Sequence, residues 1–65
     1  MVEQVKYELQ SKMEKFIRDT TVLYISVGYK REIAEQMAED ELAQHLDSLP
    51  ASIGNILYHI WKGEN

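Results

Sequence analysis

Residues 2–20 read VEQVKYELQSKMEKFIRDT, and apolar side chains return in this stretch every three or four positions. That spacing places them on one face of an α-helix, whose period is 3.6 residues. The stripe consists of Val2, Val5, Leu9, Met13, Phe16 and Thr20. Away from this stripe, Glu8 precedes Lys12 by four residues, an order of charges that stabilises a helix by about 0.3 kcal/mol. We therefore expect a long amphipathic first helix.

The next ten residues, 20–29, are rich in β-branched and aromatic side chains, which favour a strand. A single strand would have no partner to pair with, whereas helical spacing gives a second apolar stripe that runs into the good helix formers of residues 30–38. This second stripe consists of Val22, Ile25, Tyr29, Ile33 and Met37. We favour helix, either as a continuation of the first or newly begun at residues 19–21. Gly28, which costs about 1 kcal/mol inside a helix, marks the expected bend.

Acidic residues at 39–41 precede a third apolar stripe of Leu42, Leu46 and Leu49. Acids stabilise the first turn of a helix, so we expect a new helix here with Asp40 as its cap. Pro50 predicts a turn at residues 47–50 and a last helix after it, which Gly63 ends. The sequence thus predicts an all-α protein: one domain spanning residues 1–65, folded as a small bundle of three to four helices or a long helical hairpin.

A domain of 65 residues buries only a modest core, and the absence of cysteine removes disulfides as a supplement. With 45% hydrophobic residues the chain is too apolar to be disordered. Self-association is the remaining way to add stability to so small a core, so we expect a homodimer that completes the bundle. The apolar run at residues 22–27 is far shorter than the roughly 20 residues of a membrane span, and the acid at Glu3 does not suit an export signal. These features predict a cytoplasmic protein with no membrane contact.

Charge is divided unevenly along the chain. Residues 1–31 contain six basic and four acidic groups, whereas residues 32–65 contain one and seven. Because phosphate backbones are bound mainly by Lys and Arg, the second half disfavours nucleic acid as a partner.

Residues 42–46 (LAQHL), followed by Ser52, Ile53 and Ile56, nevertheless resemble the spacing of a helix-turn-helix DNA-binding unit within residues 42–61. Asp47 stands where that family usually has a glycine. The resemblance implies that the last helix would read the major groove, starting from Pro50, Ala51, Ser52 and Asn55. The basic residues that would hold phosphates are Lys6, Lys12, Lys15, Arg18, Lys30 and Arg31. A DNA-binding regulator is therefore the alternative function.

Catalytic and metal-binding patterns are sparse. Glu41 and His45 lie four residues apart on one helical face, but nothing in the sequence completes a four-ligand zinc site around them. His59 has no partner in sequence, and the glycines do not form a phosphate-binding loop. We therefore expect no enzyme activity, no metal and no cofactor.

The last helix is apolar on more than one side, and a small monomer has little with which to cover a second side. We expect this surplus to contact a protein target of unspecified identity, so that the chain acts as a small regulatory adaptor or inhibitor. The candidate contact residues are apolar or aromatic side chains and an acidic rim: Ile56, Tyr58, Ile60, Trp61, Tyr24, Tyr29, Glu39, Asp40 and Glu41.

Overall fold

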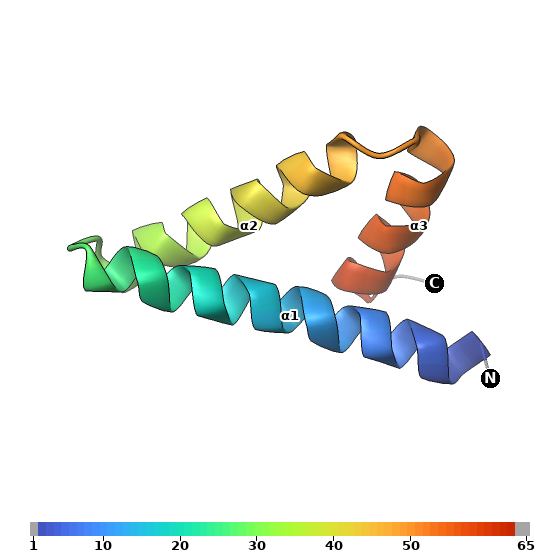
Figure 1. The fold of residues 1–65 in the computed structure, drawn as a ribbon, viewed down its shortest axis with the longest axis horizontal. Helices are drawn as coiled ribbons and strands as arrows, with labels where there is room; N and C mark the ends of the chain where they lie inside the picture. The colour runs from blue at the N-terminus through green and yellow to red at the C-terminus, as the bar shows by residue number, and fades with distance from the viewer. Residues whose placement is uncertain (1, 64–65) are drawn as a thin grey trace.

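The structure, a computed structural model, describes residues 2–63, with side chains from Gln4 onward. In this range the chain forms three α-helices and no strand: α1 (Val2–Ser26), α2 (Arg31–Asp47) and α3 (Ala51–Lys62) (Figure 1). The predicted all-α class and the small helical bundle are confirmed. The predicted place of the Val2 side chain lies outside the described side chains.

The ambiguous segment at residues 20–29 is helical as far as Ser26, because α1 continues through it. The chain then reverses, and the Tyr29 N–H donates to the Tyr24 carbonyl at 3.1 Å as it leaves the helix. Gly28 has a φ of 113°, a conformation that other residues rarely adopt, so the bend predicted there is confirmed. The prediction that Val22 through Met37 forms one helical stripe is wrong, because the turn divides it.

The acids at Glu39, Asp40 and Glu41 lie in the middle of α2. The prediction of a new helix capped by Asp40 is therefore wrong. The physical reason is a continuous buried face with a spacing of four: Ala34, Ala38, Leu42 and Leu46. Ala34 and Ala38 of this face are buried next to the turn, and Leu42 and Leu46 lie in the core with residues of α1 and α3, so a single helix is buried along one face from end to end.

The predicted turn at residues 47–50 is confirmed, since α2 ends at Asp47 and α3 begins at Ala51. Gly63 ends α3 with a left-handed φ of 71°, as expected for a C-terminal glycine. Gly54 is buried where α3 crosses the end of α2, and a Cβ on it would lie 2.8 Å from the Leu46 carbonyl oxygen. The missing side chain lets the two helices meet.

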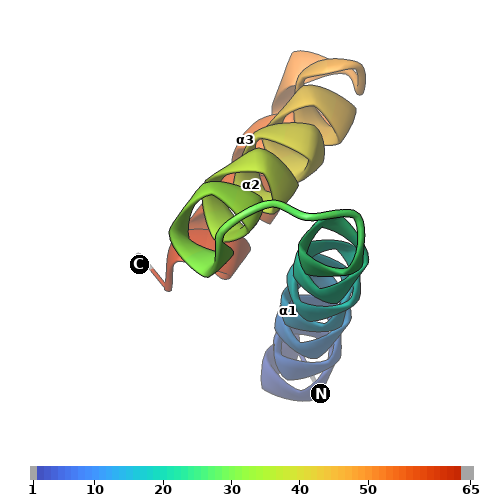
Figure 2. The ribbon, with the colours of Figure 1, turned by 90° about the vertical axis from the view of Figure 1, so that its left-hand side faces the viewer.

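The helices form a triangle. α1 and α2 diverge from the turn between them, and α3 folds back across the widening gap toward the first half of α1 (Figure 1). Viewed from the turn, α1 lies to one side and α2 and α3 to the other (Figure 2). The core of Met13, Leu42, Leu46 and Ile60 lies in this gap. We call this half of the molecule the packed end, comprising residues 9–17, 39–46 and α3.

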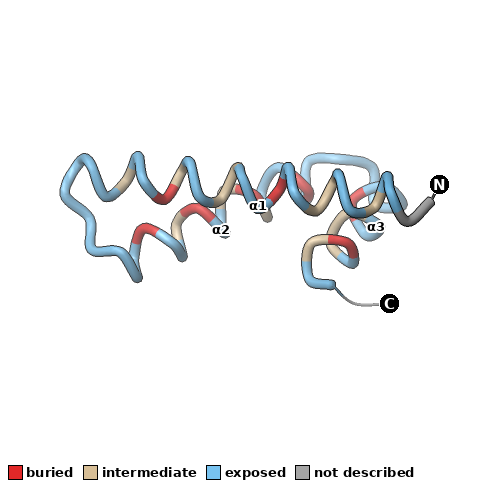
Figure 3. The backbone as a smooth tube through the Cα atoms, turned by 90° about the horizontal axis from the view of Figure 1, so that it is seen from below, coloured by how far each residue is buried: buried red, intermediate tan, exposed pale blue. Residues whose placement is uncertain are grey.

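The other half, residues 18–38, is the hairpin end, in which only α1 and α2 pack against each other. Figure 3 shows that the turn and most residues beside it are exposed. The radius of gyration is 12.8 Å, against about 11 Å for a compact domain of this length. The bundle is therefore open at the hairpin end.

Candidate functional site

Large apolar residues are exposed around the hairpin turn, from Ile25 at 41% to Val27 at 68% of the residue's accessible area. The full set is Val22, Leu23, Ile25, Val27, Tyr29 and Ile33. They stay exposed because the seam of α2 here is made of Ala34 and Ala38, short side chains that cover little of α1, and because α3 packs at the other end. This group of exposed apolar side chains is the candidate interaction surface of the hairpin end.

The seam between α1 and α2 divides this surface into two sides. Thr21 is buried against α2. Successive residues turn by 100° around a helix, so Val22 and Ile25 lie to one side of Thr21 and Tyr24 lies to the other. We call these the groove side and the tyrosine side.

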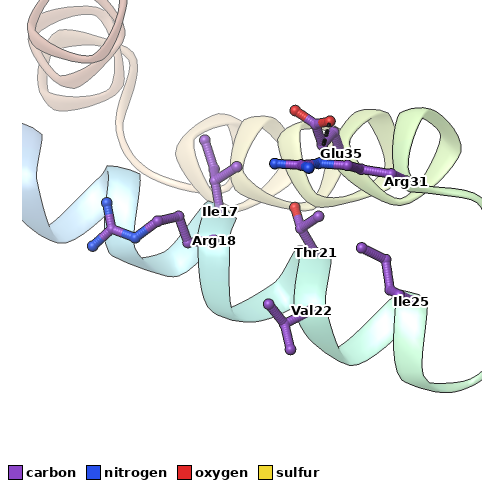
Figure 4. A pocket seen from close by; sticks show the side chains of 7 residues that line it. All are labelled: Ile17, Arg18, Thr21, Val22, Ile25, Arg31 and Glu35. Carbon is purple, nitrogen blue, oxygen red and sulfur yellow. Dashed lines mark ion pairs between the residues drawn. The ribbon is translucent and has the colours of Figure 1, made fainter.

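On the groove side, an open groove of about 300 Å³ runs between the two helices (Figure 4). It is lined by Ile17, Arg18, Thr21, Val22, Ile25, Arg31 and Glu35. Arg31 and Glu35 form an exposed ion pair at 3.6 Å on its α2 wall. The Thr21 hydroxyl is buried in its floor and has no hydrogen-bond partner within the described part of the chain. The groove thus combines an apolar floor, one unsatisfied hydroxyl and a rim with charges of both signs.

On the tyrosine side, the rings of Tyr24 and Tyr29 pack edge to face with centroids 5.7 Å apart. The Tyr24 hydroxyl donates a hydrogen bond to the Glu41 carboxylate, which is the main reason that the pKa of Tyr24 lies above its usual value of 10.0. Partial desolvation and the negative charge of Glu41 add to the same shift. The structure therefore brings together three residues that the sequence predicted as contact residues, from α1, the turn and α2.

The predicted contact residues of α3 lie at the packed end and form a separate group. Tyr58 and Trp61 are half-buried, with ring centroids 5.7 Å apart, and the Lys62 ammonium lies 4.2 Å from the centre of the Trp61 ring. Ile60 is buried in the core, whereas Ile56 is 60% exposed. The nine predicted residues therefore do not form one site, and Ile60 belongs to the core.

Residues of the acidic rim also differ in their surroundings. Glu39 and Asp40 are exposed on α2, while Glu41 is partly buried beside Tyr24. His45, four residues after Glu41, packs its ring edge to face against Phe16 at 5.7 Å. In the described residues, no three His, Cys, Asp or Glu side chains are grouped so that they could hold a metal ion.

The segment that resembles a helix-turn-helix unit does form two helices joined by the short turn of residues 48–50. The close crossing depends on Gly54 in the second helix, however, whereas Asp47 at the family's glycine position is simply the last residue of α2. Ala51, Ser52 and Asn55 are exposed at the start of α3.

Comparison with protein-family models, with curated proteins and with solved structures finds no match to the chain. None of the helices in residues 2–63 has both the length and the apolar character needed to cross a bilayer.

Sequence reasoning did not identify the groove. The helical spacing predicts Thr20 on the apolar stripe, whereas the buried threonine is Thr21, and Ile17, which lines the groove, belongs to none of the predicted stripes. The spacing of Ala34 and Ala38 could have indicated the groove. Small residues four apart favour a close contact between two helices, and the helix surface on either side of that contact is left exposed.

Proposed function

We propose that this chain is a non-enzymatic protein-binding protein, a small regulatory adaptor or inhibitor that forms a homodimer and binds a protein target. The observation that carries the proposal is the apolar surface of the hairpin end, whose side chains are 41–68% exposed. Keeping such surface in water costs about 25 cal/mol per Å², a cost that contact with a partner removes.

The tyrosine side is the surface proposed for the target. Tyrosines are favoured at protein interfaces because a rigid ring supplies apolar area and its hydroxyl a polar contact. Here two tyrosines pack against each other, and α2 places Glu41 beside them. Glu39 follows the groove residue Glu35 by about one helical turn, so it lies on the groove side of α2. This arrangement suits a target with an apolar centre and a basic residue that can reach Glu41.

Quantitative affinity capture from the cells that make the protein tests this proposal. The immobilised chain is compared with Tyr29→Ala, which removes a ring that is 45% exposed, and with Tyr7→Ala as a matched control whose ring is 70% exposed far from the turn. A target should be retained by the native chain and by Tyr7→Ala and lost with Tyr29→Ala. Equal retention by all three would contradict the tyrosine side as the target surface.

A DNA-binding regulator is the second candidate, favoured by the short turn between α2 and α3 and their close crossing at Gly54. The charges oppose it, because α2 contains six acidic residues and α3 has only Lys62 as a permanent cation. DNA held by phosphate contacts is released as salt rises, so the test is retention of the protein on DNA at low and high salt. No retention at low salt would exclude this candidate.

A further inference from the structure

We infer that the groove side of the hairpin end is where two copies of this chain meet, with α1 at the centre of the contact. The inference rests on the proposed function in one respect, the claim that the chain self-associates, and adds to it the surface and the helix involved. The tyrosine side then stays free for the target.

The area of the molecule supports a second copy as the occupant. One copy exposes 5189 Å², whereas a typical folded monomer of 7.6 kDa exposes about 4300 Å². The excess of about 900 Å² is close to the roughly 800 Å² that each partner buries in a standard interface. One further copy docked on each chain is therefore enough to bring the exposed area down to that of an ordinary globular protein.

The groove has the chemistry of such a contact. Its floor is apolar through Ile17, Val22 and Ile25, and the buried Thr21 hydroxyl lacks a hydrogen-bond partner within the described residues. A second copy that covers this apolar floor removes its side chains from water, which is favourable.

The charges on the groove rim suit two identical surfaces. A two-fold contact is self-complementary, so its rim must offer both signs of charge. Arg18 and Arg31 provide the positive charges and Glu35 the negative charge. Arg18 has no ion pair within the chain as far as it is described, which leaves it available to an acid of the other copy.

Charge also determines which helix lies at the centre. α2 carries six acidic residues and one arginine, a net charge of −5 with His45 neutral. Two copies of α2 side by side would repel each other. The part of α1 nearer the turn contributes the apolar residues Val22 and Ile25 to the groove. Arg18 is the one charged residue that the described part of α1 contributes there. A two-fold axis close to these residues places α1 at the centre and keeps the two α2 helices apart.

Sedimentation equilibrium of the full chain tests the inference. The native chain should be dimeric, and Val22→Asp combined with Ile25→Asp should raise the dimer dissociation constant by at least about 100-fold, since charges would enter an apolar contact. Ile53→Asp is the matched control, because Ile53 is 49% exposed on α3, away from the groove, and its variant should dimerise like the native chain. Circular dichroism checks that each variant remains helical.

Cysteine cross-linking decides the question even if the aspartate variant fails to fold. The chain has no cysteine, so a single introduced thiol can pair only with the same thiol of another copy. Under mild oxidation, Val22→Cys should give a disulfide-linked dimer and Ile53→Cys should remain unlinked.

The outcomes separate this inference from the proposed function. A dimer that survives Val22→Asp with Ile25→Asp, or that cross-links through Ile53→Cys and not Val22→Cys, would overturn the groove contact and leave self-association intact. A native chain that stays monomeric at all concentrations would overturn both the groove contact and the proposed dimer. Target capture that depends on Tyr29 would be unaffected by either result.

Discussion

The packed end and the hairpin end are built from the same two helices and differ in the size of the residues along the α2 seam. In the packed end the seam residues are Leu42 and Leu46, which hold α2 away from α1 and leave room that α3 fills (Figure 1). In the hairpin end they are Ala34 and Ala38, both fully buried, which draw the helices together. Side-chain volume along one stripe thus determines where a third helix fits.

The two ends differ accordingly in what they leave uncovered. The four core residues of the packed end are 5–8% exposed, and six large apolar residues around the turn of the hairpin end are 41–68% exposed. The packed end also leaves Ile53 and Ile56 exposed, on the outer face of α3. No large side chain in the described residues is fully buried, so the hydrophobic core is small even in the packed end. We infer that the packed end supplies most of the stability, and that the hairpin end keeps its apolar surface for binding.

The largest expected effect tests this division with one substitution made at both ends. Leu46→Ala removes a side chain that is 5% exposed and should lower the free energy of unfolding by about 3 kcal/mol, through lost burial and a cavity. Leu23→Ala removes the same atoms from a position that is 63% exposed and should cost under about 0.5 kcal/mol. Urea unfolding followed by circular dichroism at low protein concentration gives both values. Similar costs would show that the two ends are equally packed.

Local rules were sufficient for much of the fold. The turn at residues 47–50, the bend at Gly28 and the end of α3 at Gly63 were predicted, because proline and glycine restrict or free the backbone at their own positions. The single helix through residues 31–47 was not predicted, since the acids at 39–41 resemble a helix start. Only the burial of Ala34 and Ala38 against α1 shows that these acids lie within one continuous helix.

The candidate site was predictable only in part, because the sequence indicates which residue types suit a contact but not which of them the fold brings together. Tyr24, Tyr29 and Glu41 were chosen as aromatic and acidic contact residues, but their proximity depends on the hairpin. The sequence predicts Ile60 as a contact residue, yet Ile60 lies in the core, because the crossing at Gly54 sets which face of α3 turns inward. The groove requires residues from two helices and could not be read from the spacing within either one.

A pair of glycine substitutions gives the next largest effect and separates packing from backbone conformation. A Cβ at Gly54 would lie 2.8 Å from the Leu46 carbonyl oxygen, so Gly54→Ala must push α3 outward. We expect a net loss of about 1–2 kcal/mol, because overpacking outweighs the roughly 1 kcal/mol that alanine gains in a helix. Gly28→Ala meets no atom within 4 Å, but its φ of 113° strains any side chain by about 1 kcal/mol.

Fluorescence of Trp61 distinguishes the two glycines. Trp61 packs against the core of the packed end, so Gly54→Ala should shift its emission to longer wavelength as α3 moves, and Gly28→Ala should leave it unchanged. A shift in both variants would mean that the two ends are not independent, and the division between them would have to be abandoned.

The smallest expected effect concerns the tyrosine side and is a change in pKa. Glu41→Gln removes the charge that Tyr24 bonds to, so the pKa of Tyr24 should fall toward 10.0. Glu35→Gln is the matched control, since it removes the same charge from the groove side of the same helix and should leave the titration unchanged. Phenolate absorbance follows the titration, and Tyr24→Phe identifies the contribution of this residue among the four tyrosines.

The same contact predicts how stability depends on pH. The pKa of Tyr24 is raised in the folded chain, so the hydrogen bond to Glu41 stabilises the fold fully below pH 10 and is lost as the pH rises through the folded pKa. The native chain should therefore lose more stability than Glu41→Gln in alkaline solution, as measured by urea unfolding at pH 8 and above pH 10. Equal losses of stability would show that Tyr24 and Glu41 are not coupled. The Tyr24 ring would then not be held in place by α2, and the proposal of the tyrosine side as an ordered binding surface would lose its support.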